Sequence, residues 1–207
     1  MEDPFQLVLG TGNNKKRAEL ELLLANYPVQ LSSLKDFDAV EEPEETGNTF
    51  AANAAIKAEY YAKQFDRWVL AEDSGLCVKA LDGAPGVYSA RYSGPHATDQ
   101  SNNELLIENI KDIEPSNRHA WYTCHICIAD PNGNIVAEST GQCHGRILCT
   151  PRGDGGFGYD PLFELPEYHR TFGELGACVK KVLSHRGRAY RQLMPKLIAI
   201  TQMVSSV

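Results

Sequence analysis

Apolar and polar residues follow one another along this chain with two periods, one typical of strands and one typical of helices. Short apolar runs that end in glycine, asparagine or acidic residues predict strands at residues 5–9, 29–31, 68–71, 76–81, 119–130, 135–145 and 162–165. Segments with leucine or alanine at helical spacing predict helices at residues 15–27, 50–65 and 98–113, and a last helix from about residue 189.

Residues 130–134, DPNGN, are a strong turn signal and predict a hairpin of the two strands around them. Pro195 lies inside the last helical pattern, where we expect it to kink the helix or to start a new one. The 207 residues suit one domain, or one domain with a small lobe.

The composition narrows the class of protein. A hydrophobic fraction of 43% and a charged fraction of 23% are ordinary for a soluble globular protein. The net charge of −7 disfavours a nucleic acid polymer as the partner, because a phosphate backbone needs a basic face. No apolar run approaches the roughly 18 residues of a membrane span, and the N-terminus has no signal-peptide pattern, so we expect no membrane partner and a cytoplasmic location.

The six cysteines raise the question of a disulfide or a metal site. Without an export signal, reduced thiols are expected. Cys124 and Cys127 lie within the expected strand WYTCHICIA, where positions three apart point to opposite faces. We therefore expect these two thiols to pack in the core rather than to share a structural zinc ion.

A glycine- and asparagine-rich turn follows the first strand. Gly10-Thr11-Gly12-Asn13-Asn14 leads into a helix headed by Lys15 and Lys16. Backbone N–H groups and the positive helix end favour a phosphate at such a turn, although an ordinary strand-to-helix connection gives the same pattern. The P-loop motif is absent.

Carboxylates gather in two places. Glu44 and Glu45 belong to an acidic run, which reads either as a solvated loop or as a source of metal ligands. Asp73 follows an apolar strand and precedes a glycine turn at Ser74-Gly75, a position where α/β enzymes place catalytic groups. On the alanine-rich helix between them, Asn53 and Lys57 are four residues apart and share one face, which points either into a site or into solvent.

The segment GGFGYD, with Pro161 behind it, suits neither a strand nor a helix. Glycine weakens a strand unless the backbone bends or something approaches it closely. The flat ring of Phe157 on this bare backbone suits stacking on a nucleobase. The alternative is a tight glycine turn that leads into the next strand.

Six segments together carry a resemblance to a known family. They are TGNNKK, EETGNTFAANAAIKA, AEDSGL, GAPGVYSARYSG, GGFGYDP and SHRG. Their order and spacing resemble the inosine/xanthosine triphosphate pyrophosphatases over nearly the whole chain. The resemblance implies Mg²⁺-dependent hydrolysis of ITP, dITP and XTP to the monophosphate and pyrophosphate, by a cytoplasmic homodimer that cleanses the nucleotide pool.

The resemblance also implies a fold and a set of site residues. The fold is a mixed α/β structure with a long twisted central sheet, flanking helices and two lobes around a nucleotide-binding cleft, all within a single domain, residues 1–207. The catalytic residue is Asp73, and the metal ligands are Glu44, Glu45 and Asp73. The substrate-binding residues are Thr11, Gly12, Asn13, Asn14, Lys15, Lys16, Ser74, Phe157, Gly158, Tyr159, Asp160, Lys180, His185 and Arg186, with Asn53, Lys57 and Arg91 in support.

Two residues depart from the family pattern. Glu72 stands where many relatives have a second aspartate, which leaves the role of that carboxylate open, and Pro195 is unusual in the last helix. The chemistry suits the residues: lysines, turn amides and Mg²⁺ neutralise a triphosphate, and an aspartate orients or deprotonates water. Arg186 and His185 can donate to the purine 6-oxygen, which adenine replaces with a donor, whereas the exclusion of GTP has no evident cause in the sequence.

Two other functions fit parts of the pattern. A regulator that senses purine triphosphates without hydrolysing them would be expected to lack the acidic residues, yet Asp73, Glu44 and Glu45 are present. A hydrolase for modified pyrimidine nucleotides would share the phosphate-binding residues, and the base pocket would separate it from a purine enzyme.

Overall fold

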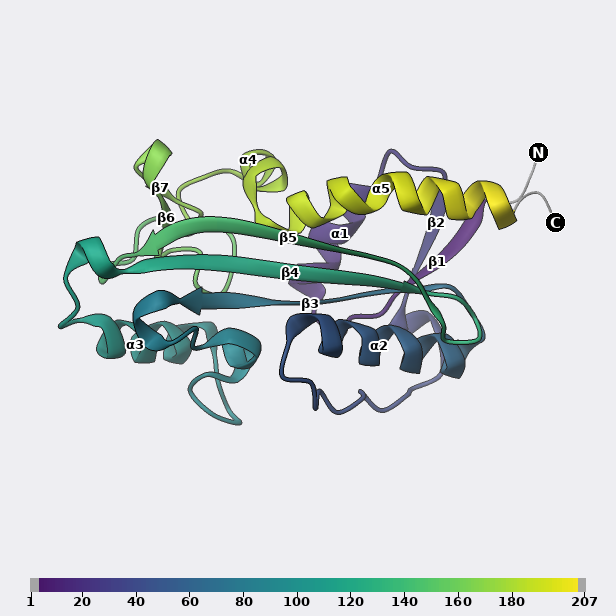
Figure 1. Cartoon of the computed structure of the whole chain (residues 1–207), viewed down its shortest axis with the longest axis horizontal. Helices are drawn as coiled ribbons and strands as arrows, with labels where there is room; N and C mark the ends of the chain where they lie inside the picture. Colours follow the sequence, from purple (N-terminus) through teal and green to yellow (C-terminus); the bar gives the residue numbers. More distant parts are fainter. Residues whose placement is uncertain (1–3, 205–207) are drawn as a thin grey trace. The chain divides into compact units, whose positions relative to one another are not determined.

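A computed structural model describes residues 4–204 of the chain (Figure 1). Its strands are β1 (Phe5–Leu9), β2 (Val29–Ser33), β3 (Val69–Val78), β4 (His119–Ala129), β5 (Ile135–Ile147), β6 (Phe163–Leu165) and β7 (Arg170–Thr171). Its α-helices are α1 (Asn14–Leu24), α2 (Phe50–Phe65), α3 (Asp99–Ile110), α4 (Ala177–Leu183) and α5 (His185–Val204).

The strands form one mixed sheet in the order β2-β1-β3-β4-β5-β6-β7. β1 runs parallel to both β2 and β3, while β6 runs antiparallel to β5 and to β7. The α/β class, the mixed sheet and the flanking helices are therefore confirmed.

The chain divides into two compact units. The first unit comprises residues 1–73, 124–141 and 189–207, and the second comprises residues 74–123 and 142–188. The division passes through β3, β4 and β5, so that each of these strands contributes residues to both units.

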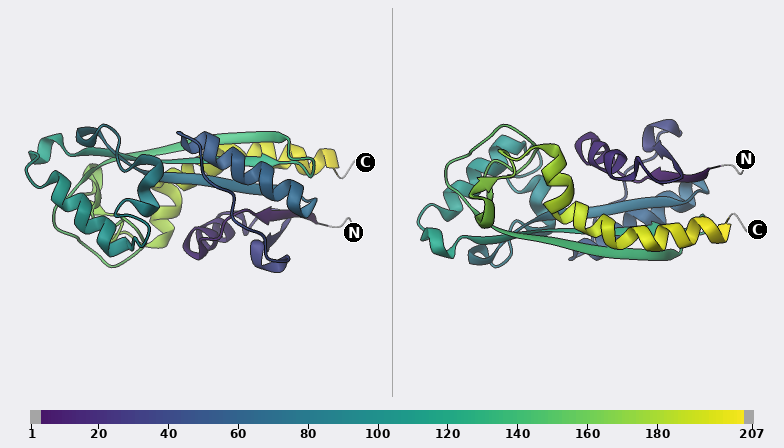
Figure 2. Two further views of the ribbon diagram at one scale, coloured as in Figure 1. Left: turned by 90° about the horizontal axis from the view of Figure 1, so that it is seen from below. Right: turned by 90° about the horizontal axis from the view of Figure 1, so that it is seen from above.

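The first unit has helices on both faces of its strands. α1 and α5 cover one face, where Leu20 and Leu193 join a buried cluster with Leu70 and Ile126. α2 covers the other face through a buried cluster that includes Ala58. Figure 1 shows α2 and α5 on opposite sides of β3 and β4, and Figure 2 shows α5 running along β4 and β5.

The second unit has its own core. α3 contributes Leu106 and Ile110 to a cluster that contains aromatic rings from the strands and from the loops between them. The centroids of the Tyr122 and Phe163 rings are 4.7 Å apart, and Phe172 stacks on Phe163 at 5.4 Å. Each unit thus buries apolar side chains of its own.

The segment from Trp68 to Leu81 differs from its prediction. We expected two short strands separated by a turn at Ser74-Gly75, but β3 runs without interruption from Val69 to Val78. All of its residues except Ser74 are buried, and β1 and β4 flank it in the sheet. A central strand of this kind gains enough from burial and pairing to outweigh the weak strand preference of a single glycine.

The C-terminal segment also differs. α5 begins at His185 rather than near Ala189, and it continues through Pro195, so no new helix starts there and the expected kink stays a prediction. Leu193 and Leu197, on either side of the proline, pack in the same core cluster, and this burial offsets the lost backbone hydrogen bond. α4 and β7 had no predicted counterpart. Within residues 4–204, none of the helices is both long enough and apolar enough to cross a membrane.

Candidate active site

The turn after β1 caps α1 with its own side chains. The Asn13 side-chain oxygen accepts hydrogen bonds from the backbone N–H groups of Lys15, at 3.0 Å, and Lys16, at 3.1 Å. The backbone N–H of Asn13 donates to Thr11 Oγ1 at 3.2 Å. Two of the amides that we expected to face a phosphate are therefore already satisfied by Asn13, because asparagine is a preferred N-cap residue. Gly12 and Asn14, in the same turn, are exposed.

Lys57 links two carboxylates of the first unit. Its Nζ atom lies 2.7 Å from Glu45 Oε1 and 3.1 Å from Asp73 Oδ1. All three side chains are largely removed from solvent, with exposed fractions of 14% for Lys57, 24% for Glu45 and 7% for Asp73. The acidic loop, α2 and β3 thus meet at a single ammonium group. Glu44 is exposed, so Glu45 is the glutamate that the structure brings to Asp73.

Asn53, one turn before Lys57 on α2, holds the same two segments together. Its Nδ2 group donates to Asp73 Oδ2 at 3.3 Å, and its side-chain oxygen accepts from the backbone N–H of Gly47 at 2.8 Å. A Cβ atom at Gly47 would lie 2.6 Å from that oxygen, so the close approach requires glycine there. The expectation that Asn53 and Lys57 share a face that points at functional groups agrees with this geometry.

The electrostatics of Asp73 suit proton transfer. Burial raises the pKa of Asp73 above its ordinary value, whereas the positive charges of Lys57 and Lys16 act to lower it. Burial acts to lower the pKa of Lys57, but the charges of Asp73 and Glu45 outweigh it, so the pKa of Lys57 is raised. Asp73 is therefore a buried carboxylate beside a lysine that remains charged at neutral pH.

Glu72, the residue that departs from the family pattern, is also buried. Its Oε1 atom lies 3.5 Å from Lys16 Nζ, and its Oε2 atom accepts a hydrogen bond from the Cys124 thiol at 3.3 Å. Its side chain has no exposed surface. The sequence did not reveal this partnership, because Lys16 and Glu72 are on different elements and Cys124 read as a core residue only.

The donor set around Asp73 suits Mg²⁺. The carboxylates of Asp73 and Glu45 offer oxygen atoms, which are the ligands that this hard cation prefers. A pair of carboxylates that shares one lysine has excess negative charge, which a divalent cation would neutralise.

A second group of predicted site residues lies in the second unit, around the loop that carries Phe157. Asp160 Oδ2 accepts from the backbone N–H of Phe157 at 2.8 Å, which closes the loop as a tight turn. Gly156 and Gly158 have φ angles of +75° and +60°, in the region that favours glycine. The carbonyl of Gly158 accepts from Asn103 Nδ2 at 3.0 Å, a support from α3 that the sequence did not indicate.

Lys180 of α4 packs against this loop. Its Nζ atom donates to Asp160 Oδ2 at 2.6 Å and lies 4.4 Å from the centroid of the Phe157 ring. The side chains of Lys180 and Asp160 are 8% and 3% exposed. A buried ion pair of this kind fixes the loop, and the cation on the ring face holds the half-buried Phe157 in one orientation.

His185 and Arg186, at the start of α5, are buried as well. The guanidinium of Arg186 donates to Ser74 Oγ at 3.1 Å, and its central carbon lies 6.0 Å from the Phe157 ring centroid. The His185 ring stacks on Tyr122 with centroids 4.6 Å apart. A Cβ atom at Gly187 would lie 1.9 Å from the carbonyl oxygen of Lys181, so the glycine of SHRG permits the close approach of α4 to α5.

Two further predicted residues, Tyr159 and Arg91, make contacts with residues 86–91. Tyr159 is buried, and its hydroxyl donates to the backbone carbonyl of Ser89 at 2.8 Å. This bond joins the loop to the segment of residues 86–91. Arg91, at the end of that segment, is exposed and lies 5.3 Å from the Tyr88 ring.

Comparison with known proteins gives a consistent result. A model of the Ham1 family matches residues 7–196. The dITP/XTP pyrophosphatase of Rhodopirellula baltica is 50% identical over 206 residues, which cover 100% of this chain and 99% of that protein. The dITP/XTP pyrophosphatase of Listeria monocytogenes is 43% identical and covers 97% of this chain and 98% of its own length.

Solved structures of other proteins are similar to this chain as well. A HAM1 protein from Coxiella burnetii superposes with a TM-score of 0.86 at 38% identity, covering 94% of this chain and 99% of that one. The nucleoside-triphosphatase / dITP/XTP pyrophosphatase from Mycobacterium abscessus has a TM-score of 0.75 at 39% identity, covering 93% and 100%. Because a family model and full-length relatives both match nearly all of its residues, the chain belongs to the Ham1 family.

Proposed function

We propose that this protein hydrolyses non-standard purine nucleoside triphosphates, such as dITP, ITP and XTP, to the nucleoside monophosphate and pyrophosphate. In this reaction one water molecule attacks the α-phosphorus, the bond to the bridging oxygen breaks, and pyrophosphate leaves. The names of the full-length relatives support the substrate class. The observation that carries the chemistry is the buried carboxylate of Asp73 with Lys57 at 3.1 Å and Asn53 at 3.3 Å.

Asp73 is assigned the catalytic role. Its raised pKa suits a group that accepts a proton from water, and Lys57 and Asn53 fix both of its oxygens. Glu45 and Asp73 would hold Mg²⁺, which supplies charge neutralisation for the phosphate chain when bound. Glu72 is assigned a positioning role, because its contact with Lys16 orients that lysine.

The turn Thr11–Lys16 is assigned to the phosphates, with Lys16 as its main cation. Since Asn13 already occupies two of the amides, the positive charges of Lys15 and Lys16 contribute more here than free backbone groups do.

The base is assigned to residues of the second unit. Phe157 offers a ring face for stacking, and Lys180 and Asp160 hold its loop. Arg186 and His185 are the donors that suit a purine 6-oxygen, and Ser74 keeps the Arg186 guanidinium in place. Arg91 remains a candidate for a supporting role.

Three further features belong to this proposal. They are the dependence on Mg²⁺, a homodimeric assembly and a cytoplasmic location, and the family resemblance supports each of them. We also propose that both units form one catalytic domain, because the three strands β3, β4 and β5 are common to them.

The test is release of pyrophosphate from ITP, XTP, dITP, GTP, ATP and dUTP, with and without Mg²⁺. The proposal predicts rapid release from the first three nucleotides and only with the metal. Orthophosphate as the first product would move the attack to the γ-phosphorus and contradict the assigned reaction. Preference for dUTP would favour a pyrimidine enzyme, and binding without any hydrolysis would favour a regulator.

A further inference from the structure

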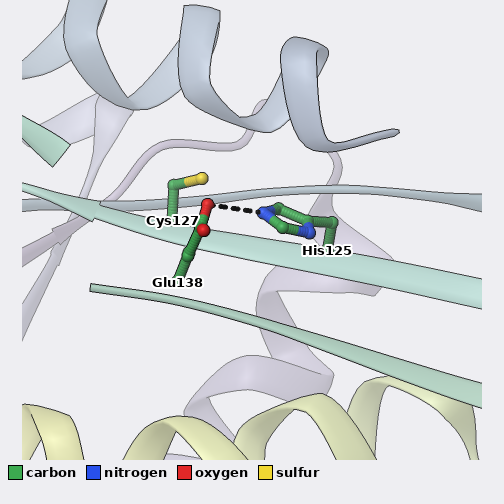
Figure 3. Close-up of side chains that lie close together, drawn as sticks. All are labelled: His125, Cys127 and Glu138. Carbon is green, nitrogen blue, oxygen red and sulfur yellow. Dashed lines mark ion pairs between the residues drawn. The ribbon is translucent and has the colours of Figure 1, made fainter. Parts of the chain in front are cut away.

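His125, Cys127 and Glu138 form a cluster that the proposed reaction does not use. His125 and Cys127 are two residues apart on β4 and therefore share a face, while Glu138 comes from the neighbouring strand β5. One donor atom from each residue lies within 4.8 Å of the other two. Figure 3 shows the three side chains gathered over the strand pair, and all three belong to the first unit.

His125 and Glu138 lie at the distance of an ion pair, which is also the distance between two ligands of one metal ion. The His125 Nε2 and Glu138 Oε2 atoms are 3.4 Å apart, which exceeds the usual range for an N–H···O bond of about 2.7–3.2 Å. Tetrahedral zinc ligands at about 2.0–2.3 Å from the ion are about 3.3–3.8 Å from one another. The separation of nitrogen and oxygen already suits an ion between them.

The second observation is that Nε2 of His125 is buried and has no hydrogen-bond partner. The residue is only 8% exposed. A buried polar atom that makes no hydrogen bond is costly, so native proteins rarely leave one. Its other ring nitrogen, Nδ1, lies 2.7 Å from Thr140 Oγ1. If Nδ1 donates this bond, Nε2 presents its lone pair toward Glu138, the orientation that metal-binding histidines take from an outer partner.

We propose that His125, Cys127 and Glu138 bind a zinc ion that links β4 to β5. Sulfur, imidazole and carboxylate together suit borderline-soft Zn²⁺ and not Mg²⁺, and three protein ligands with one open position are an established zinc arrangement. Glu138 is 63% exposed, so its side chain is able to move the remaining distance toward the thiol.

Binding replaces the thiol proton by the metal, and the proton is released to solvent. Burial, with the negative charges of Glu138 and Glu59, raises the pKa of the Cys127 thiol to about 12. Removing this proton opposes binding, whereas the same negative charges attract the cation. This site differs from a Cys124–Cys127 pair, whose thiols pack in clusters on opposite faces of β4.

The experiment uses the full chain, first stripped of bound metal with a chelator and then placed in excess Mg²⁺, which occupies sites built from oxygen alone. Zn²⁺ should raise the melting temperature, and Co²⁺ should bind at one equivalent with a thiolate-to-metal absorption band. Glu138→Gln should lower the affinity for Zn²⁺ and Co²⁺ at least about tenfold. Thr140→Val should lower these affinities by about 10- to 100-fold. Glu108→Gln is the matched control, because Glu108 is 65% exposed and lies on α3.

Cys127→Ser should abolish the cobalt band, while Cys178→Ser, which removes an exposed thiol, should leave it intact. The proposal is overturned if no cobalt band appears at one equivalent of metal. It is also overturned if the band disappears in Cys178→Ser and persists in Cys127→Ser. If Cys127→Ser does not fold, the zinc affinity of Glu138→Gln tests the proposal instead. A zinc affinity equal to that of the wild type would contradict the metal site and leave only an ion pair beside a buried thiol.

Discussion

Lys57 Nζ lies 3.1 Å from Asp73 Oδ1 while the same ammonium binds Glu45 at 2.7 Å. One buried cation therefore serves two carboxylates from different segments of the chain. Burial raises the pKa of Asp73 and Lys57 opposes that rise, so the lysine helps to determine the pKa of the proposed catalytic base.

Replacing Asp73 by asparagine should lower kcat by about 100- to 10,000-fold, because the variant keeps the size of the side chain and loses the group that accepts the proton. The affinity for dITP should change little, since the lysines of the first turn remain. Calorimetric binding and pyrophosphate release measure the two quantities. Asp82→Asn is the control, because Asp82 is exposed with a φ angle of 51°, a conformation that asparagine tolerates. Turnover within about tenfold of wild type would place catalysis elsewhere.

Lys57→Met should move the acidic limb of the pH profile to higher pH. The positive charge of Lys57 acts to lower the pKa of Asp73, so its removal lets that pKa rise, and activity is lost earlier as the pH falls. Lys57→Arg keeps the charge and should leave the limb near its original position. The measurement is kcat/KM for dITP against pH at saturating Mg²⁺. An unchanged limb in the methionine variant would show that another group controls this ionisation.

Arg186→Ala should reduce the preference for ITP over ATP by about tenfold. The variant loses a hydrogen-bond donor to the 6-oxygen of hypoxanthine, which adenine lacks, and such a bond contributes roughly 1–3 kcal/mol. Lys16→Ala should lower kcat/KM for both nucleotides by the same factor, since it acts on the phosphates that they share. Circular dichroism should first confirm that each variant folds, as Arg186 is only 1% exposed and Lys16 pairs with Glu72. An equal loss for ITP and ATP in Arg186→Ala would reassign base selection to His185 or to the loop of Phe157.

Glu164 should stabilise the fold in a pH-dependent way. Burial acts to raise its pKa, but hydrogen bonds from Arg146 and Arg152 outweigh burial and hold the pKa below its ordinary value of 4.5. A carboxylate with a depressed pKa contributes stability above its unfolded pKa and loses it as the pH falls through the folded one. Urea unfolding should therefore show that Glu164→Gln is destabilised by about 1–3 kcal/mol at pH 7 and by less in acid. An equal difference at both pH values would contradict this linkage.

Much of the fold could be predicted because local patterns and tertiary packing agree. The strand Phe5–Leu9 has the predicted bounds, and so does the helix Phe50–Phe65, which Thr49 caps. β3 was predicted wrongly because Ser74 and Gly75 favour a turn locally, and only pairing with β1 and β4 keeps them in a strand.

The site could be predicted in part. The spacing of Asn53 and Lys57 indicated a shared face, but no local signal shows that Glu45, and not Glu44, reaches Lys57. Partners far apart in sequence, such as Lys16 with Glu72 or Asn103 with Gly158, follow from the topology of the whole chain. The same holds for the burial of Arg186 at the start of α5.

The unbroken course of β3 has a consequence for how the enzyme loses activity on heating. Its residues 69–73 are all buried, and backbone amides in such a strand exchange with deuterium only when the surrounding structure opens cooperatively. We therefore expect strong exchange protection at Asp73, the proposed catalytic residue. Heat inactivation should coincide with loss of the whole first unit, and no active-site disorder should precede it.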